Sequence, residues 1–458
     1  MALDRVGYRW AGAWLFLGLT LALGACGGDD NQAPQSDVHD DDVREEVHED
    51  VSDEVDTTPD PDTGEDVDPS DTDEGDVSDV EEEEVVELEL PPRPWSVYAS
   101  GPFRSGFRIE RGHTYIPRGD EEERRIRFSM WYPTHARSGE IARYVNSLLA
   151  QRNRPVHANA PLARNAGDRL PVLIFSHGNS SLAEQSFFMT EFFATHGWVV
   201  ISPDHTGNTF FDNQGAINIE AAYVRPQDLS YIIDYLETLP EDHFLYGRLD
   251  LDSIVVSGHS FGGFTTLAIG GGEFAVEELT EDCGTGAVTG RYCTILGSPQ
   301  IVEVFREGLG DPRVRVAIPQ TPAGAQVFRE GLEALQIPTL LMTGALDRST
   351  SNAEEGDPIW NYMRGSQHMR LDLERGGHFT FSNMCDFFGF TEQIADDGCS
   401  EGFIPATEAY DIINAYAMAF VRLHLFGDDA YPELLYNDES PFEGVRISLK
   451  PEDDVTEP

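Results

Sequence analysis

A short glycine-rich segment between an expected strand and an expected helix constrains this chain more than any other feature. Residues 258–262, Gly-His-Ser-Phe-Gly, fit the pattern G-x-S-x-G. The apolar run 253–257 predicts a buried strand, and 261–269 predicts a helix. So sharp a turn strains the backbone of its serine, needs glycines beside it, and leaves the hydroxyl exposed near the positive end of the helix. We therefore expect Ser260 to be a nucleophile.

Strand-like and helical segments alternate along the rest of the chain. The expected strands are 98–108, 124–132, 171–176, 198–202, 253–257, 314–318, 338–343 and 369–373, and the expected helices are 182–196, 226–239, 261–269 and 406–426. The stretch between 133 and 170 is expected to be irregular. Such alternation predicts an α/β fold with a mostly parallel central sheet and helices on both faces.

A serine hydroxyl is a poor nucleophile until a base accepts its proton. His378 follows the expected strand 369–373, and Asp347 follows the expected strand 338–343. Both therefore lie where open α/β sheets place their sites. We expect His378 to be the base and Asp347 to orient and stabilise the imidazole. His368 as the base and Asp357 as the acid are alternatives.

A negatively charged tetrahedral intermediate needs hydrogen-bond donors that are already in place. We expect these donors to be the backbone N–H groups of Phe261, directly after the serine, and Asn179, in the turn after strand 171–176. Three histidines close to these segments are expected to line or support the site: His177, His205 and His259. Four aromatic residues are candidates for an acyl pocket, with a place in the core as the alternative: Phe210, Phe211, Phe379 and Phe381.

Four cysteines lie in the C-terminal part of the chain: Cys283, Cys293, Cys385 and Cys399. Three pairings are possible, and the local one, 283–293 with 385–399, costs the least loop-closure entropy. A 385–399 bridge would stiffen the loop that follows His378. No CxxC or HExxH spacing is present, so we expect no metal site and no organic cofactor. The insertion 271–310 is long enough for a lid with a short helix at 301–308; a plain surface loop is the alternative.

The N-terminus has the pattern of an export signal, with two arginines, an apolar run over 10–23 and small residues before Cys26. Residues 23–26, Leu-Gly-Ala-Cys, resemble the lipobox of bacterial lipoproteins, in which the cysteine is diacylated. That resemblance implies a signal peptide over 1–26 and a membrane-anchored lipoprotein on the periplasmic or cell-surface side of an outer membrane. An ordinary cleaved signal peptide is the alternative.

Charge divides the chain into parts. The whole sequence has 82 acidic and 31 basic residues, and residues 29–89 hold 29 of the acids against one base, Arg44. Residues 27–92 are therefore expected to form a disordered acidic tether to a folded domain, 93–458, that ends in an acidic tail at 440–458. A calcium-binding repeat is an alternative for the tether, although EF-hand spacing is absent. The electrostatic field of this large excess of negative charge repels the phosphate backbone of nucleic acids, so the sequence excludes nucleic-acid binding.

Lysine usage excludes further classes of enzyme. The only lysine is Lys450, close to the C-terminus. Schiff-base enzymes, Ser–Lys dyads and phosphate-loop nucleotidases all need a lysine within the site. We therefore expect none of these activities. Separately, nothing in the sequence indicates a protein partner, and we expect none.

Four segments together resemble a known group: 172–179, 196–209, 225–229 and 258–263. They are similar to serine α/β-hydrolases known as predicted dienelactone hydrolases, relatives of platelet-activating-factor acetylhydrolases and cutinase-like polyester hydrolases. The resemblance covers about 124–425 and implies the α/β-hydrolase fold and cleavage of carboxylic esters through an acyl-enzyme on Ser260. It departs from dienelactone hydrolases proper, which use cysteine. It also departs from the plasma acetylhydrolases, because residues 317–322 hold no carboxylate; the acid is then Asp347, as in the polyester hydrolases.

Three other functions stay open beside general ester cleavage. The same machinery would serve a phospholipase A2-like or a polyester-cleaving enzyme, and peptidase activity is a further use of it. A different class is a catalytically silent surface-binding module on a hydrolase scaffold. The intact order of serine, aspartate and histidine favours an enzyme that acts on a small-molecule or lipid-like ester.

Overall fold

The computed structural model describes residues 90–91, 93–144, 152–213, 220–289, 293–294, 296–387 and 397–451. The expected signal peptide 1–26, the lipidation site Cys26 and the tether 27–92, except residues 90–91, lie outside these residues, as does the end of the acidic tail from 452 onward. None of the helices described is long and apolar enough to cross a membrane.

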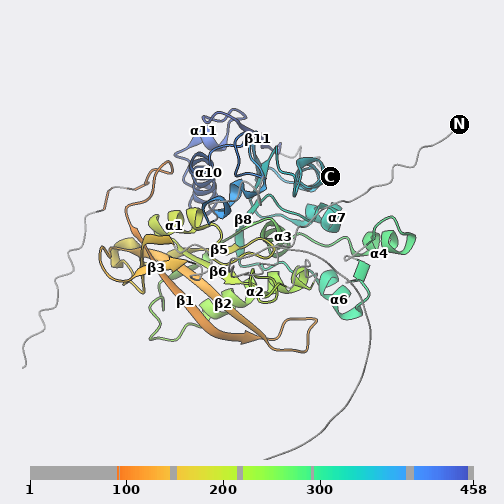
Figure 1. The fold of residues 1–458 in the computed structure, drawn as a ribbon, viewed down its shortest axis with the longest axis horizontal. Coiled ribbons are helices and arrows are strands. Elements are labelled where there is room, and N and C mark those ends of the chain that lie inside the picture. Colours follow the sequence, from red (N-terminus) through yellow and green to blue (C-terminus); the bar gives the residue numbers. More distant parts are fainter. Residues whose placement is uncertain are drawn as a thin grey trace, which may run out of the picture. The chain divides into compact units, whose positions relative to one another are not determined.

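In the described part of the chain, one sheet of 11 strands forms the centre of the domain, in the order β11-β10-β9-β8-β7-β5-β6-β2-β1-β4-β3 (Figure 1). Strands β5 to β10 run parallel to one another, while β2 and β11 pair antiparallel at the two sides of this group. The bounds are β1 Arg104–Tyr115, β2 Arg124–Thr134, β3 Ile141–Tyr144, β4 Arg152–Ala158, β5 Leu170–Ser176, β6 Val199–Asp204, β7 Leu249–His259, β8 Val314–Gln320, β9 Thr339–Gly344, β10 His368–Leu373 and β11 Val445–Leu449.

Helices cover both faces of this sheet (Figure 1). The bounds are α1 Phe187–Thr195, α2 Ala221–Glu237, α3 Phe261–Ile269, α4 Val276–Thr285, α6 Pro299–Glu307, α7 Ala325–Phe328, α8 Asp357–Tyr362, α9 Met384–Phe387, α10 Ala406–Phe426 and α11 Pro432–Leu435. Alternate side chains of β5 serve the two faces. Leu173 and Phe175 join the core of α1 and α10, while Val172 and Ile174 join that of α2. Because both faces are buried, the strand is a continuous apolar run.

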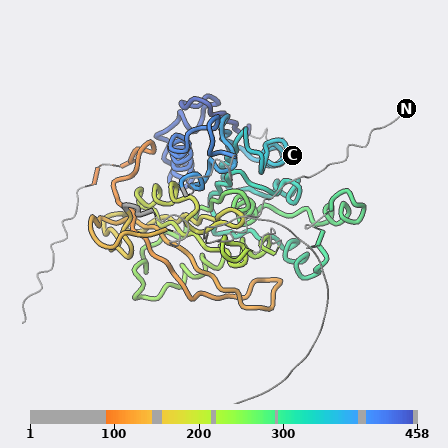
Figure 2. The backbone as a smooth tube through the Cα atoms, in the orientation of Figure 1, coloured from red at the N-terminus to blue at the C-terminus, as the bar shows by residue number. Residues whose placement is uncertain are grey.

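The predicted α/β architecture is confirmed, with corrections to single elements. The stretch 133–170, expected to be irregular, contains β3 and β4 at one edge of the sheet. The first strand begins and ends later than expected and forms a long hairpin with β2 (Figure 2). The expected acidic tail at 440–458 includes β11, which pairs with β10. These strands lie toward the edges, where one-sided burial gives a weaker apolar pattern.

The insertion 271–310 contains α4 and α6, so the short helix expected at 301–308 is confirmed. Ser298 caps α6 by accepting a hydrogen bond from the Ile301 N–H. The aromatic rings of Phe274 and Phe305 lie 4.4 Å apart and belong to the same core cluster as Phe264 of α3. Within its described residues, the insertion is therefore packed onto the helix that follows Ser260.

Candidate active site

Ser260 occupies the turn between β7 and α3. Its backbone has φ 59° and ψ −117°, a region that residues other than glycine rarely adopt. A Cβ atom on Gly262 would lie 1.9 Å from the Ser176 carbonyl oxygen, and one on Gly258 would lie 2.4 Å from the Gly262 oxygen. Both flanking positions therefore require glycine, as the sequence pattern predicts, and the strained turn presents the Ser260 hydroxyl at the end of the strand.

The structure brings Ser260, His378 and Asp347 together from the ends of β7, β10 and β9. The Ser260 Oγ lies 2.9 Å from the His378 Nε2, and the His378 Nδ1 lies 2.9 Å from the Asp347 Oδ2. His378 and Asp347 are buried, whereas Ser260 is partly exposed. Hydroxyl, imidazole and carboxylate thus form one hydrogen-bonded series with its reactive oxygen accessible.

The surroundings of Asp347 keep its carboxylate ionised. Burial opposes ionisation, but the facing imidazole of His378 and hydrogen bonds from Thr350 together hold the pKa of Asp347 below its ordinary value. The backbone N–H groups of Ser349 and Thr350 donate to its Oδ1 at 2.8 and 2.7 Å. An ionised Asp347 accepts the Nδ1–H of His378, which leaves Nε2 unprotonated and able to accept the proton of Ser260.

Asp397 is a buried carboxylate that the sequence analysis did not identify. It accepts hydrogen bonds from the His378 N–H at 3.1 Å, from the Arg348 N–H at 3.1 Å and from the Ser349 hydroxyl at 2.8 Å. These donors belong to the loops after β10 and β9. Asp397 therefore joins the loop that carries the imidazole to the loop that carries Asp347.

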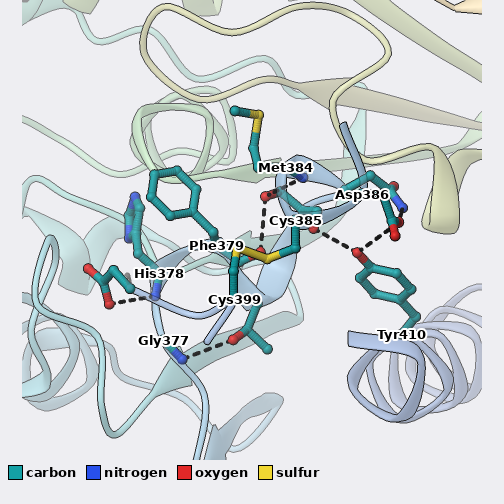
Figure 3. Close-up of a disulfide and its surroundings, with 12 residues drawn as sticks. Gly377, His378, Phe379, Met384, Cys385, Asp386, Cys399 and Tyr410 are labelled. Atoms are coloured by element: carbon teal, nitrogen blue, oxygen red, sulfur yellow. Dashed lines mark hydrogen bonds between the residues drawn. A yellow bond between two sulfur atoms is a disulfide. The ribbon is translucent and has the colours of Figure 1, made fainter. Parts of the chain in front are cut away.

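Both predicted disulfides are present, in the local pairing: Cys283–Cys293 and Cys385–Cys399. Figure 3 shows the second bridge beside His378 and Phe379. Cys399 lies two residues after Asp397, and Cys385 lies in α9, which follows His378. The bridge thus fixes the segment that carries Asp397 to the segment that follows the imidazole.

The two alternatives left open for the acid and the base lie away from Ser260. Asp357 forms an ion pair with Arg370 at 2.7 Å, and its side chain is 56% exposed. His368 is the first residue of β10, at the opposite end of the strand from the loop that carries His378. The geometry favours Asp347 and His378 over both.

The two expected oxyanion donors are unused in the described part of the chain: neither the Asn179 N–H nor the Phe261 N–H donates to another group there. The Gly178 carbonyl, in the peptide that carries the Asn179 N–H, accepts hydrogen bonds from the His177 Nδ1–H at 2.6 Å and the Ser181 N–H at 3.3 Å. Because a trans peptide directs its N–H opposite to its carbonyl, these bonds orient the Asn179 N–H. Gly178 lies beside Ser260, since a Cβ on it would be 3.5 Å from the serine Cβ.

The histidine next to the serine links two parts of the site. His259 is buried, and burial together with the nearby His378 lowers its pKa to about 3. Its Nε2–H donates to the His378 carbonyl at 2.8 Å, and its Nδ1 accepts from the Gln185 amide at 2.7 Å. The Gln185 oxygen in turn accepts the Gly178 N–H at 2.6 Å. His259 therefore has the expected supporting role: hydrogen bonds through its ring connect the loop that carries His378 to the loop 177–180.

His177 and His205 are also fully buried, and burial together with nearby Arg225 lowers the pKa of both, to about 3 for His205.

The four aromatic candidates for an acyl pocket differ in their exposure to solvent. Phe381 is fully buried, so the place in the core left open for it is confirmed, while Phe379 is half-buried. Phe210 and Phe211 are exposed. Among the described residues no group of three metal-ligating side chains is present.

Comparisons with known proteins give a family model and a similar solved structure. Residues 131–215 match the family model described as platelet-activating factor acetylhydrolase, isoform II. A ferulic acid esterase from Streptomyces cinnamoneus is similar in structure, with a TM-score of 0.54 and 22% sequence identity over 77% of this chain and 98% of that chain. No curated protein matches the chain. The chain has an α/β-hydrolase fold. The matches that accompany this fold are to an acetylhydrolase family model and to an esterase structure.

Proposed function

We propose that this protein hydrolyses carboxylic esters through an acyl-enzyme on Ser260. The observation that carries the proposal is the hydrogen-bonded series from Ser260 through His378 to Asp347. The serine oxygen attacks the ester carbonyl carbon as the His378 Nε2 takes its proton, and Asp347 stabilises the resulting imidazolium. The intermediate expels the alcohol, which His378 protonates, and a water molecule then releases the acid by the same steps.

The negative oxygen of each intermediate is bound, in this proposal, by the N–H groups of Asn179 and Phe261. Both lie beside Ser260 in sequence or in space, and neither is used by another described group. Each donor of this kind lowers the barrier by about 3–4 kcal/mol. The two N–H groups therefore supply a large part of the rate enhancement.

The substrate we propose is a small or lipid-like ester with an apolar acyl group. Phe210 and Phe211 are exposed, with their rings 5.4 Å apart, and the Phe210 N–H donates to the Ser181 carbonyl next to the Asn179 loop. A short sn-2 phospholipid is the second candidate, because residues 131–215 match the acetylhydrolase family model. Polyesters are a third possible substrate of the same machinery.

We also propose that the enzyme is exported and anchored through a lipid on Cys26, by the lipobox-like sequence at 23–26. Metabolic labelling with a radioactive fatty acid tests this: the wild type should incorporate label, and Cys26→Ala should not. Equal labelling of both would exclude the anchor.

Labelling with a fluorophosphonate probe, followed by mass identification of the modified residue, tests the activity and the nucleophile together. Wild type should be modified on Ser260, and Ser260→Ala should stay unlabelled. Ser253→Ala, at the start of the apolar part of β7, is the matched control and should label like wild type. If the wild type stayed unlabelled, the proposed ester hydrolysis would be excluded, and the catalytically silent surface-binding module would be the remaining function. Hydrolysis of nitrophenyl esters, short sn-2 phospholipids and polyester film then separates the substrates.

A further inference from the structure

A fully buried arginine lies beneath the loop that carries Asn179. Arg225, in α2, is 0% exposed. Its guanidinium donates to the His177 carbonyl oxygen, to the Ser176 hydroxyl at 3.2 Å and to the Asn208 Oδ1 at 3.1 Å. It also lies over the ring of Phe261, 4.9 Å from the centroid. No step of ester hydrolysis described above uses this side chain.

The contacts of Arg225 lead to both proposed oxyanion donors. Asn208 accepts from Arg225 with its amide oxygen and donates with its amide nitrogen to the Asn179 Oδ1 at 2.8 Å. The bond to the His177 carbonyl fixes the preceding part of the same loop. The stacking contact fixes Phe261, whose N–H is the second donor. One planar guanidinium thus connects two stretches of chain that are far apart in sequence.

The burial of Arg225 is not compensated by a carboxylate of its own. Asp228 is fully buried and binds Arg124 at 2.7 Å and the His205 Nδ1 at 2.7 Å. The charge of Asp228 acts on Arg225 as well as on Arg124, so two guanidinium groups depend on one carboxylate, and His205 contributes no charge because its pKa is lowered to about 3. A buried charge without an equal partner costs stability. Arg225 lies beside the site where the negative charge of the tetrahedral intermediate develops, so its buried charge can contribute to catalysis.

We propose that Arg225 is a positioning residue that holds the N–H groups of Asn179 and Phe261 in place for the oxyanion, through Asn208 and through the Phe261 ring. This inference rests on the proposed ester hydrolysis. It assigns no contact with substrate to Arg225. It predicts that the side chain affects the stability of the tetrahedral state more than the binding of the ester.

Substitutions separate the charge of Arg225 from its shape. Arg225→Met removes both and should lower kcat by about 10- to 100-fold, part of the roughly 10²–10³-fold that a lost donor costs, with KM within about threefold. Arg225→Lys keeps the charge but lacks the planar fork, so it should recover only part of kcat. Asn208→Leu removes the connection to Asn179, leaves Arg225 intact, and should lower kcat in the same direction.

The readout that distinguishes positioning from folding is the inhibition constant of a short-chain alkyl trifluoromethyl ketone, which forms a tetrahedral oxyanion adduct with an active serine. It should rise in proportion to the fall in kcat/KM across wild type, Arg225→Met, Arg225→Lys and Asn208→Leu. Rates are expressed per active site, titrated with the fluorophosphonate. Arg422→Met, which removes a packed arginine from α10, is the control and should leave both quantities at wild-type values.

The possible results decide between the two proposals. Wild-type activity with an unchanged kcat and ketone affinity in Arg225→Met overturns the role of Arg225 and leaves ester hydrolysis intact. If Arg225→Met does not fold, an unchanged kcat and ketone affinity in Asn208→Leu overturns the role of Arg225 in the same way. A wild type that neither labels nor hydrolyses any ester overturns the proposed function, and the role of Arg225 with it.

Discussion

The carboxylate of Asp397 connects the two loops that carry Asp347 and His378, so its neutralisation should affect stability and catalysis together. Asp397→Asn keeps the size of the side chain but replaces one acceptor oxygen by an NH2 donor. Three groups then lose a charged acceptor: the His378 N–H, the Arg348 N–H and the Ser349 hydroxyl.

The magnitude follows from these three bonds. A hydrogen bond to a charged group contributes about 1.5–3 kcal/mol and a neutral one about 0.5–1.5 kcal/mol. Asp397 is only 8% exposed, so solvent screens little of this difference. The free energy of unfolding should fall by about 3 kcal/mol. Because the anchor of the His378 backbone is weakened, kcat should also fall by about 10- to 100-fold, since a displacement of about 1 Å has an effect of that size.

The assay combines urea unfolding with kcat measured per fluorophosphonate-titrated site. Asp311→Asn is the matched control: Asp311 is also 8% exposed and accepts three bonds from Arg313, but it precedes β8, whereas Ser260 follows the neighbouring parallel strand β7, so the two residues lie at opposite ends of these strands. It should lose comparable stability and keep wild-type kcat. If Asp397→Asn retained wild-type kcat, or lost less than about 1 kcal/mol, the argument for Asp397 would be refuted.

Three further perturbations test other features of the structure. Gly262→Ala would place a carbon 1.9 Å from the Ser176 oxygen and should cost about 3 kcal/mol or more in urea unfolding; a stable, normally labelled variant would contradict the strained turn. Replacing Cys385 and Cys399 by serine opens a bridge of separation 14 and should cost about 3 kcal/mol in thermal unfolding, so an unchanged melting temperature would count against it. Three fully buried histidines beside the site have lowered pKa values: His177, His205 and His259. The pKa of each histidine in the folded protein lies below its value of about 6.5 in the unfolded chain. The free energy of unfolding is therefore highest above about pH 6.5 and falls as the pH is lowered, because the unfolded chain binds protons first. At about pH 5.5 each histidine should have lowered the free energy of unfolding by about 1.4 kcal/mol. Urea unfolding that is equally stable at pH 7.5 and pH 5.5 would show that these imidazoles are not held neutral.

The sequence predicted the central strands well and the edge strands poorly, for a physical reason. Strands such as β5 are buried on both faces and appear as continuous apolar runs. In β11, by contrast, only Ile447 is buried, and acidic residues surround the strand in the sequence. Residues 133–170 are rich in arginine and asparagine, so β3 and β4 gave no apolar pattern to detect.

The residues of the proposed triad were predictable because each follows a strand in a fixed chain order. The support of Asp347 by Thr350 also has a local signal, since an aspartate often accepts the N–H groups two and three residues later. Asp397 has no such signal: it accepts the His378 backbone N–H across 19 residues, and every residue type except proline provides such a donor. The role proposed for Arg225 depends on contacts from separate segments and could be found only in three dimensions.

β11 also bears on how this chain can be shortened. It forms an antiparallel ladder along β10, the strand that leads to His378, over residues 369–373 and 445–449. Removal of everything after residue 444 would uncover the backbone N–H and C=O groups along one side of β10, which are a ready template for another chain. A truncated enzyme should therefore self-associate through this exposed edge and precipitate, even though all the residues proposed for catalysis are retained.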